Sequence, residues 1–101
     1  MVAGILAKMA TQKDLDKGMQ IKSNALVEVN WLDACAHMNV EEINKNKLID
    51  FLCQTQTMGK VIAQDKNVLC IATNISAANG ADIIAIPIKW IKWLKIIEKT
   101  N

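Results

Sequence analysis

A single proline near the C-terminal end constrains the fold of this chain more than any other residue. The apolar run Asp82–Ile86 precedes Pro87, a turn-length stretch ends at Ile91, and a second apolar and basic segment follows at Trp93–Ile97. Proline fixes φ and has no N–H to donate, so strand pairing must end where it stands. A strand, a tight turn and a second strand are typical of the last two strands of a small, strongly bent β-barrel.

The size and composition allow one domain. A chain of 101 residues can bury one modest core, and 51% apolar with 22% charged residues is a globular composition. The net charge of +2 gives no strong attraction to polyanions. All the basic residues are lysines, and arginine is the usual bidentate reader of guanine edges. Sequence-specific base recognition is therefore not expected.

The cysteines do not indicate a metal or cofactor site. Cys35, Cys53 and Cys70 are far apart, form no Cys-x-x-Cys, and accompany only one histidine, His37. We expect all three to be small buried hydrophobic residues in a reducing cytosol. The apolar run at the N-terminus is too short to span a membrane and lacks the basic start of a secretion signal. We therefore expect a cytoplasmic protein without a membrane partner.

Residues 1–22 are predicted to be an N-terminal helix or a flexible extension, and residues 23–101 to be the β-domain. Apolar residues recur there at helical spacing: Val2, Ile5, Leu6 and Met9. The stretch Thr11–Asp14 resembles a capping box before a short turn that ends at Gly18. A docking helix and a frayed tail both remain open.

A strand is predicted from Ala25 onward. Its apolar residues are Leu26, Val27 and Val29, followed by Trp31. The apolar positions then change parity, to Leu32, Ala34, Ala36 and Met38. Such a switch indicates a bulge or sharp bend. A helix from Trp31 would also fit the spacing of Leu32, Cys35 and Met38, but we favour the bent strand.

A helix and a hairpin are predicted next. Asn39 to Glu42 is a good helix start, and an apolar face leads to an end near Cys53. That face consists of Val40, Ile43, Leu48, Phe51 and Leu52. Thr57–Asp65 and Val68–Ser76 predict a β-hairpin around a turn at Lys66 and Asn67. Residues 77–80 form a predicted loop in which Gly80 can take a positive φ.

Short strands with one tight turn before the last resemble the small barrels of the SH3-like and Sm-like groups. Ile84–Ile91 is similar to the SH3 passage in which an apolar-Pro step precedes an aromatic-aliphatic pair. Gly59–Asp65 with Asn67–Ile71 is similar to the first Sm motif, with its early glycine, acidic turn residue and asparagine. The resemblance implies a mainly β (α+β) fold: a five-stranded barrel with a helix inserted after the first strand.

Two parts of these families are missing. The second Sm motif, an aliphatic-Arg-Gly step, would fall near Ile86–Ile88 and is absent. The acidic-aromatic opening strand with which SH3 domains bind proline-rich peptides is absent as well, so we expect no polyproline groove. The overall pattern, including Val29–Cys35, is similar to uncharacterised small proteins of phage and metagenomic origin.

The Sm-like resemblance implies a nucleic-acid site at two neighbouring turns. These turns hold Lys66 and Asn67, and Lys89, Trp90 and Lys92. Lysine would contact phosphates, asparagine could bond a base, and an exposed tryptophan could stack on one. The implied function is a non-enzymatic, Sm-like binding protein with sequence-tolerant affinity for single-stranded RNA. Open edge strands would pair in a homo-oligomeric ring of about five to seven subunits.

The alternative is an SH3-like structural or adaptor module that binds only protein partners, in a phage setting. Exposure of Trp90 separates the two hypotheses, since a buried ring cannot stack on a base.

Two further patterns in the sequence have simpler explanations than a functional site. Asp33, Cys35 and His37 alternate, as a nucleophile with its base and orienting acid could. On a strand, however, Asp33 and His37 would lie ~13 Å apart, so we expect a polar face and no enzyme.

The lysines 89, 92, 95 and 99 alternate with apolar residues around Trp93. As a helix this segment would suit a membrane surface. Pro87 and the preceding β-rich sequence favour a turn followed by a strand, with solvated lysines.

Overall fold

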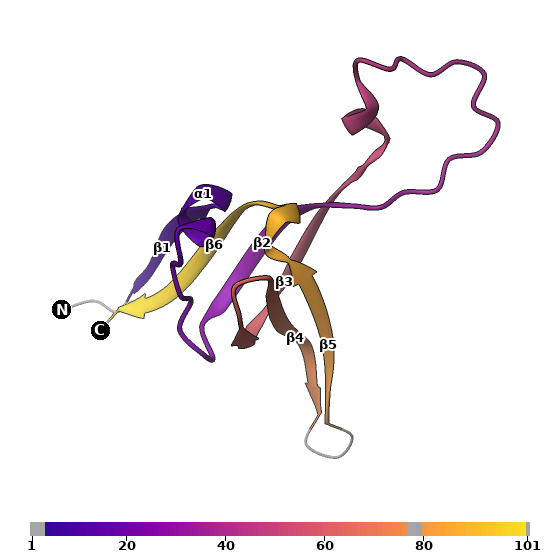
Figure 1. Ribbon diagram of the computed structural model, residues 1–101. Helices are drawn as coiled ribbons and strands as arrows, with labels where there is room; N and C mark the ends of the chain where they lie inside the picture. The colour runs from indigo at the N-terminus through magenta and orange to yellow at the C-terminus, as the bar shows by residue number, and fades with distance from the viewer. Residues whose placement is uncertain (1–3, 77–79, 101) are drawn as a thin grey trace.

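The computed structural model describes residues 4–76 and 80–100, which form one antiparallel sheet of six strands (Figure 1). The strands are β1 (Gly4–Thr11), β2 (Leu26–Asp33), β3 (Cys53–Gln64), β4 (Val68–Ser76), β5 (Gly80–Pro87) and β6 (Ile91–Thr100). Three short helical segments accompany them: α1 (Gln12–Asp16), η1 (Leu48–Phe51) and η2 (Ile88–Trp90). The strand order is β1-β6-β2-β3-β4-β5. The mainly β prediction is confirmed, but there are six strands instead of five, and the sheet is not closed into a barrel.

The sheet bends along β3, because the two halves of this strand pair with different neighbouring strands. Its residues 53–60 pair with β2, and residues 60–64 pair with β4. Gly59 lies at this change, where an added Cβ would be only 2.3 Å from the carbonyl oxygen of Ala72. A strand glycine often marks such a close backbone approach. The bend lets β4 and β5 contribute to the same core as β2 and β6.

The core lies on one face of this bent sheet. Alternate residues of β2 are buried, namely Val27, Val29 and Trp31. The cluster also contains side chains from the five remaining strands, from α1 and η2, and from the segment between α1 and β2: Ala10, Leu15, Ile21, Val61, Leu69, Ile71, Ile86, Ile88, Ile91, Leu94 and Ile96. Isoleucine and valine suit this pleated, buried surface.

The predicted irregularity near Trp31 is present, but β6 carries the extra residue. Asn30 pairs with Trp93 and Trp31 pairs with Ile91, so Lys92 is inserted between them. β2 then ends at Asp33, and the predicted extension through Ala34, Ala36 and Met38 is wrong.

The hairpin and the tight turn are confirmed. β3 and β4 flank Lys66 and Asn67, although β3 begins at Cys53 instead of Thr57. η2 and its flanking residues form the turn predicted at 87–91. Gly80 has a φ of +84° as expected, while residues 77–79 of the predicted loop lie outside the described residues.

The N-terminal segment contains a strand where helical spacing predicts a helix. β1 pairs with β6 from Gly4 opposite Thr100 to Thr11 opposite Trp93. Val2 lies outside the described residues. Backbone pairing with the edge of β6 outweighs side-chain periodicity here, since it satisfies a whole row of amide groups. The capping box is confirmed, because the Asp14 carboxylate accepts from the Thr11 N–H at 3.0 Å and the Thr11 hydroxyl accepts from the Asp14 N–H at 3.2 Å.

The predicted helix after the first strand is wrong. Residues 34–52 form an extended arm beyond the ends of β2 and β3, and η1 is its only helical segment (Figure 1). Asn39 has a φ of +55°, which is not the extended conformation of a helix cap. A short helix needs tertiary packing of its apolar face, yet Ile43 is 58% and Leu48 is 56% exposed.

A disulfide between Cys35 and Cys53 closes the base of the arm, with a Cα–Cα distance of 5.5 Å. The prediction of three buried free cysteines is therefore wrong for this pair, because the spacing of cysteines along a sequence does not show which ones meet. Cys70 on β4 is free and partly buried.

Candidate functional site

Two hydrogen bonds hold the turn that carries Trp90. The Ile88 N–H donates to the carbonyl of Asn67 at 2.9 Å, and the Gln12 side-chain amide donates to the carbonyl of Lys89. Asn67 belongs to the β3–β4 turn, and Gln12 opens α1. The two turns that the sequence analysis expected to be neighbours are thus joined within one chain.

The turn that supplies the Asn67 carbonyl is itself held by a carboxylate. The Asp65 Oδ1 accepts from the N–H groups of Asn67 and Val68, at 2.7 and 2.8 Å. These backbone bonds, with a smaller contribution from Lys66, lower the pKa of Asp65 below its ordinary value of 3.8. The Thr11 backbone N–H and hydroxyl lower the pKa of Asp14 in the same way, and so stabilise the start of α1. Two ionised carboxylates therefore support the two segments that anchor η2.

The exposed ring of Trp90 stacks on the buried ring of Trp31. Its side chain is 45% exposed, and its ring stacks on Trp31 with centroids 6.3 Å apart and planes inclined by 13°. Trp31 is only 5% exposed, and its indole N–H donates to the Thr57 hydroxyl at 3.0 Å. The exposed ring thus rests on a fixed support, as a stacking platform for a planar ligand would.

Three hollows lie around this platform. The first, here called the Trp90 groove, has a volume of about 220 Å³ and is lined by Leu32, Ala34, Leu52, Lys89 and Trp90. The second, of about 410 Å³, extends toward the arm and is lined by Leu32, Ile49, Asp50, Leu52, Gln54 and Lys92. The third, here called the amide cleft, has about 320 Å³ and is lined by Asn30, Trp31, Gln54, Thr55, Gln56, Lys92 and Trp93. Lys92 borders two of the three.

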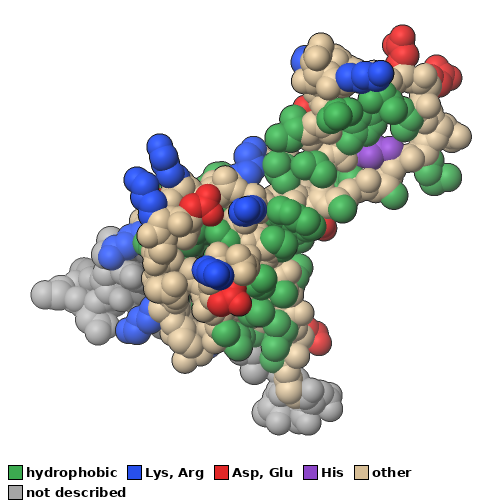
Figure 2. Space-filling model, viewed as in Figure 1, with side chains coloured by type: hydrophobic (Ala, Val, Ile, Leu, Met, Phe, Trp, Pro, Cys, Tyr) green, Lys and Arg blue, Asp and Glu red, His purple; other side chains and the backbone are tan. Residues whose placement is uncertain are grey.

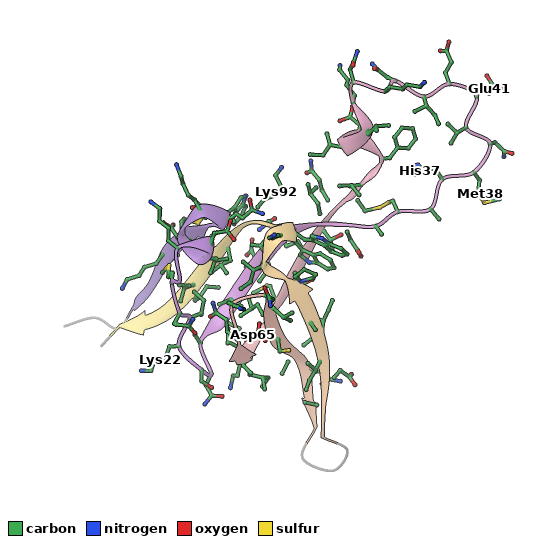
Figure 3. The ribbon with its side chains drawn as sticks, in the orientation of Figure 1. Lys22, His37, Met38, Glu41, Asp65 and Lys92 are labelled. Atoms are coloured by element: carbon green, nitrogen blue, oxygen red, sulfur yellow. A yellow bond between two sulfur atoms is a disulfide. The ribbon has the colours of Figure 1, made fainter. Side chains whose placement is uncertain are left out.

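The arm adds an apolar surface next to these hollows. Hydrophobic side chains cover much of the arm in Figure 2, and the large exposed ones are Met38, Val40, Ile43, Leu48, Ile49 and Leu52. Within the arm, the His37 Nε2 donates to the Phe51 carbonyl at 2.7 Å, and the two rings meet edge to face. Met38 and Glu41 lie on its far part, away from the sheet (Figure 3).

The predicted site residues divide into two groups. Lys89, Trp90 and Lys92 line the three hollows. Lys66 and Asn67 line none of these three, and Asp65, which precedes them, lies well away from Lys92 (Figure 3). Asn67 contributes its backbone carbonyl, and Lys66 is an exposed side chain of the turn.

The polar residues of the amide cleft are not among the residues predicted from the sequence. Gln54 and Gln56 are exposed and alternate with the half-buried Thr55 and Thr57 along β3, so the two glutamines lie on its outward face. Asn30 holds the corresponding position on β2 between two buried residues. This alternation was the available signal, but only strand pairing shows that the two polar faces adjoin.

Asp33, Cys35 and His37 do not form a catalytic group. The Asp33 carboxylate accepts from the Ala34 N–H at 2.8 Å, the Cys35 sulfur is in the disulfide, and His37 bonds Phe51. Within residues 4–76 and 80–100 no three potential metal ligands cluster.

The segment that carries Lys89, Lys92, Lys95 and Lys99 is η2 followed by β6, not a basic helix. In the described part of the chain no helix has the length and apolarity needed to cross a membrane.

Comparison of the chain with protein-family models, with curated proteins and with solved structures finds no match. The resemblance to Sm-like and SH3-like barrels therefore stays a prediction.

Proposed function

We propose that this protein is a non-enzymatic binding protein for single-stranded nucleic acid, with low sequence preference overall. The observation that carries the proposal is the exposed ring of Trp90, stacked on Trp31 and accompanied by the exposed lysines Lys89 and Lys92. Proteins that bind single strands combine aromatic platforms with cationic side chains that follow the phosphates. An unpaired base can stack on Trp90 because every base has a π-face.

A relationship to the small Sm-like and SH3-like barrels is part of the proposal. The turn η2 before the last strand and the acidic residue Asp65 at the β3–β4 turn support it. The open, six-stranded sheet departs from those barrels, since β1 occupies the free edge of β6.

We further propose that the open edges of the sheet associate between copies of the chain. β1 and β5 each have one neighbour in the sheet, so each has a row of backbone groups that another strand could pair with. Light scattering on the purified protein tests this: a discrete oligomer supports edge pairing, and a monomer at all concentrations contradicts it.

The binding proposal is tested by titrating labelled single-stranded RNA with the protein at several salt concentrations. Affinity should fall with salt, and Lys89→Ala or Lys92→Ala should weaken binding for all sequences. Each should reduce the slope of log K against log salt by about 0.7, the value for one lost phosphate contact on a single strand. The control Lys45→Ala, on the arm, should leave the slope unchanged. No binding at low ionic strength contradicts the proposal.

An adaptor that binds a protein partner is the second candidate. The exposed apolar side chains of the arm and the mostly apolar Trp90 groove favour it, because such surfaces mark protein interaction sites. The two functions differ in their dependence on charge. Nucleic-acid binding requires Lys89 and Lys92, whereas an apolar partner should bind with little dependence on salt.

A further inference from the structure

The far part of the arm is a surface that its own chain leaves uncovered. Within residues 38–43, here called the arm segment, exposed apolar side chains flank two exposed carboxylates: Met38, Val40, Glu41, Glu42 and Ile43. The side chain of Met38 is 87% exposed. Exposed apolar side chains that lie together mark an interaction site, because their removal from water is favourable. The arm segment therefore suits a partner surface that is apolar and basic.

The Trp90 groove has this chemistry. Leucine, alanine and tryptophan side chains make up most of its lining, and Lys89 is the one charged residue among the described residues that line it. The larger hollow toward the arm shares two leucines with the groove and adds Lys92 and Asp50. Because Asp50 would repel a carboxylate in the larger hollow, the Trp90 groove is the better site for the two glutamates.

The arm segment does not reach the groove of its own chain. The groove lies at the base of the arm, where Leu52 contributes to its lining. Glu41 lies on the far part of the arm, away from Lys92 (Figure 3). The disulfide at the base and the contact between His37 and Phe51 hold the two sides of the arm together. The segment is therefore available to the groove of another molecule.

We propose that the arm segment of one copy binds in the Trp90 groove of a second copy, and that the contact is reciprocal. Met38 would enter the apolar groove, and Glu41 and Glu42 would lie near the partner's Lys89 and Lys92. Because each groove lies at the base of an arm, a two-fold axis places the two arms antiparallel, with each far part at the partner's base. This dimer goes beyond the edge pairing proposed above, since it uses no edge strand.

The surface is of sufficient size for a specific dimer. Stable interfaces involve about 20–30 residues of each partner. Residues 34–52, which are nearly all exposed, form a surface of roughly 20 residues together with η2 and Lys92. The bound arm would cover part of the surface around Trp90, so single-stranded RNA should compete with the arm for it.

Two charge-reversal variants test the contact, measured by analytical ultracentrifugation in the absence of RNA. The arm variant combines Glu41→Lys with Glu42→Lys, and the groove variant combines Lys89→Glu with Lys92→Glu. Either variant alone brings like charges together at both contacts of its dimer, so the dimer dissociation constant should rise roughly 10-fold or more. An equimolar mixture of the two brings opposite charges together at both contacts. It should therefore form a heterodimer with an affinity close to that of the wild type.

The controls separate this contact from general effects of charge. The double variant Lys22→Glu and Lys66→Glu changes the net charge as much as the groove variant does, at exposed positions outside the groove. It should keep the wild-type dissociation constant. All the reversed side chains are exposed, so circular dichroism spectra should match that of the wild type.

Each other result has a definite meaning. An oligomer that persists unchanged in both variants overturns the inference and leaves edge pairing standing. Two weakened variants whose mixture does not associate overturn it as well. A monomer at all concentrations overturns both forms of association. The measurements contain no RNA, so the proposed nucleic-acid binding does not depend on their outcome.

Discussion

The rings of Trp31 and Trp90 stack at a centroid distance of 6.3 Å, although one is buried in β2 and the other is exposed on η2. Trp31 is fixed by the core and by its bond to Thr57. Trp90 is fixed by two hydrogen bonds of η2. The Ile88 N–H donates to the Asn67 carbonyl, and the Lys89 carbonyl accepts from the Gln12 side-chain amide. The exposed ring is therefore positioned before any ligand arrives, which lowers the ordering cost of binding.

Truncation of the exposed ring should remove affinity and spare the fold. Stacking of a base on an aromatic side chain contributes about 1–3 kcal/mol, so Trp90→Ala should raise Kd for single-stranded RNA roughly 5- to 150-fold. Fluorescence anisotropy at low salt measures the change, and thermal unfolding checks the fold. The control Met58→Ala removes a side chain of similar exposure on β3. Equal Kd values for Trp90→Ala and the wild type would show that Trp90 is not the stacking platform.

The sequence predicts the turns and the helix cap of this fold better than its long-range pairings. Pro87, the Lys66–Asn67 turn and the Thr11–Asp14 capping box are local signals, and each appears at its predicted place. Local signals succeed because neighbouring atoms in the chain determine them.

The failures all depend on contacts between distant residues. β1 is a strand because the edge of β6 is available to it, and the arm lacks a long helix because nothing covers its apolar face. The amide cleft exists because Asn30 and Gln56 are paired across two strands. No short segment of the sequence contains that information.

Gly59 should be harder to replace than Gly18. A Cβ at this position would lie 2.3 Å from the Ala72 carbonyl oxygen and 2.4 Å from the Ile71 Cγ2. Gly59→Ala should therefore cost about 1–3 kcal/mol or more in unfolding free energy, as overpacking does.

Urea denaturation of Gly59→Ala and Gly18→Ala compares crowding with strain. Gly18 has a φ of +99° and nothing within 4 Å of an added Cβ, so its variant carries only the left-handed backbone cost of about 1–2 kcal/mol. A Gly59→Ala protein as stable as the wild type would mean that β3 and β4 separate freely at this position.

Reduction of the disulfide between Cys35 and Cys53 should destabilise the protein. The bond joins residues 18 positions apart, and the loop-closure model gives about 3 kcal/mol for a loop of that length. Chemical denaturation with and without a dithiol measures the loss. Cys70→Ser is the control, because it should keep the response to the dithiol, whereas Cys35→Ser should abolish it. Disulfides persist in oxidising compartments, so a response in this assay also bears on the expectation of a cytosolic protein.

Acid should loosen the β3–β4 turn through Asp65. Its carboxylate accepts two backbone N–H groups, which lowers its pKa below 3.8. A lowered pKa means that the turn is fully stabilised above the unfolded value and loses that stabilisation as the pH falls through the folded value. The amide signals of Asn67 and Val68 should therefore titrate in NMR spectra with a midpoint below 3.8.

In Asp65→Asn, which can still accept both bonds but carries no titrating group, these signals should stay constant. The control Asp16→Asn, on α1, should keep the wild-type response. If the chemical shifts of these amides did not change with acid while the protein remained folded, the Asp65 carboxylate would not hold the turn.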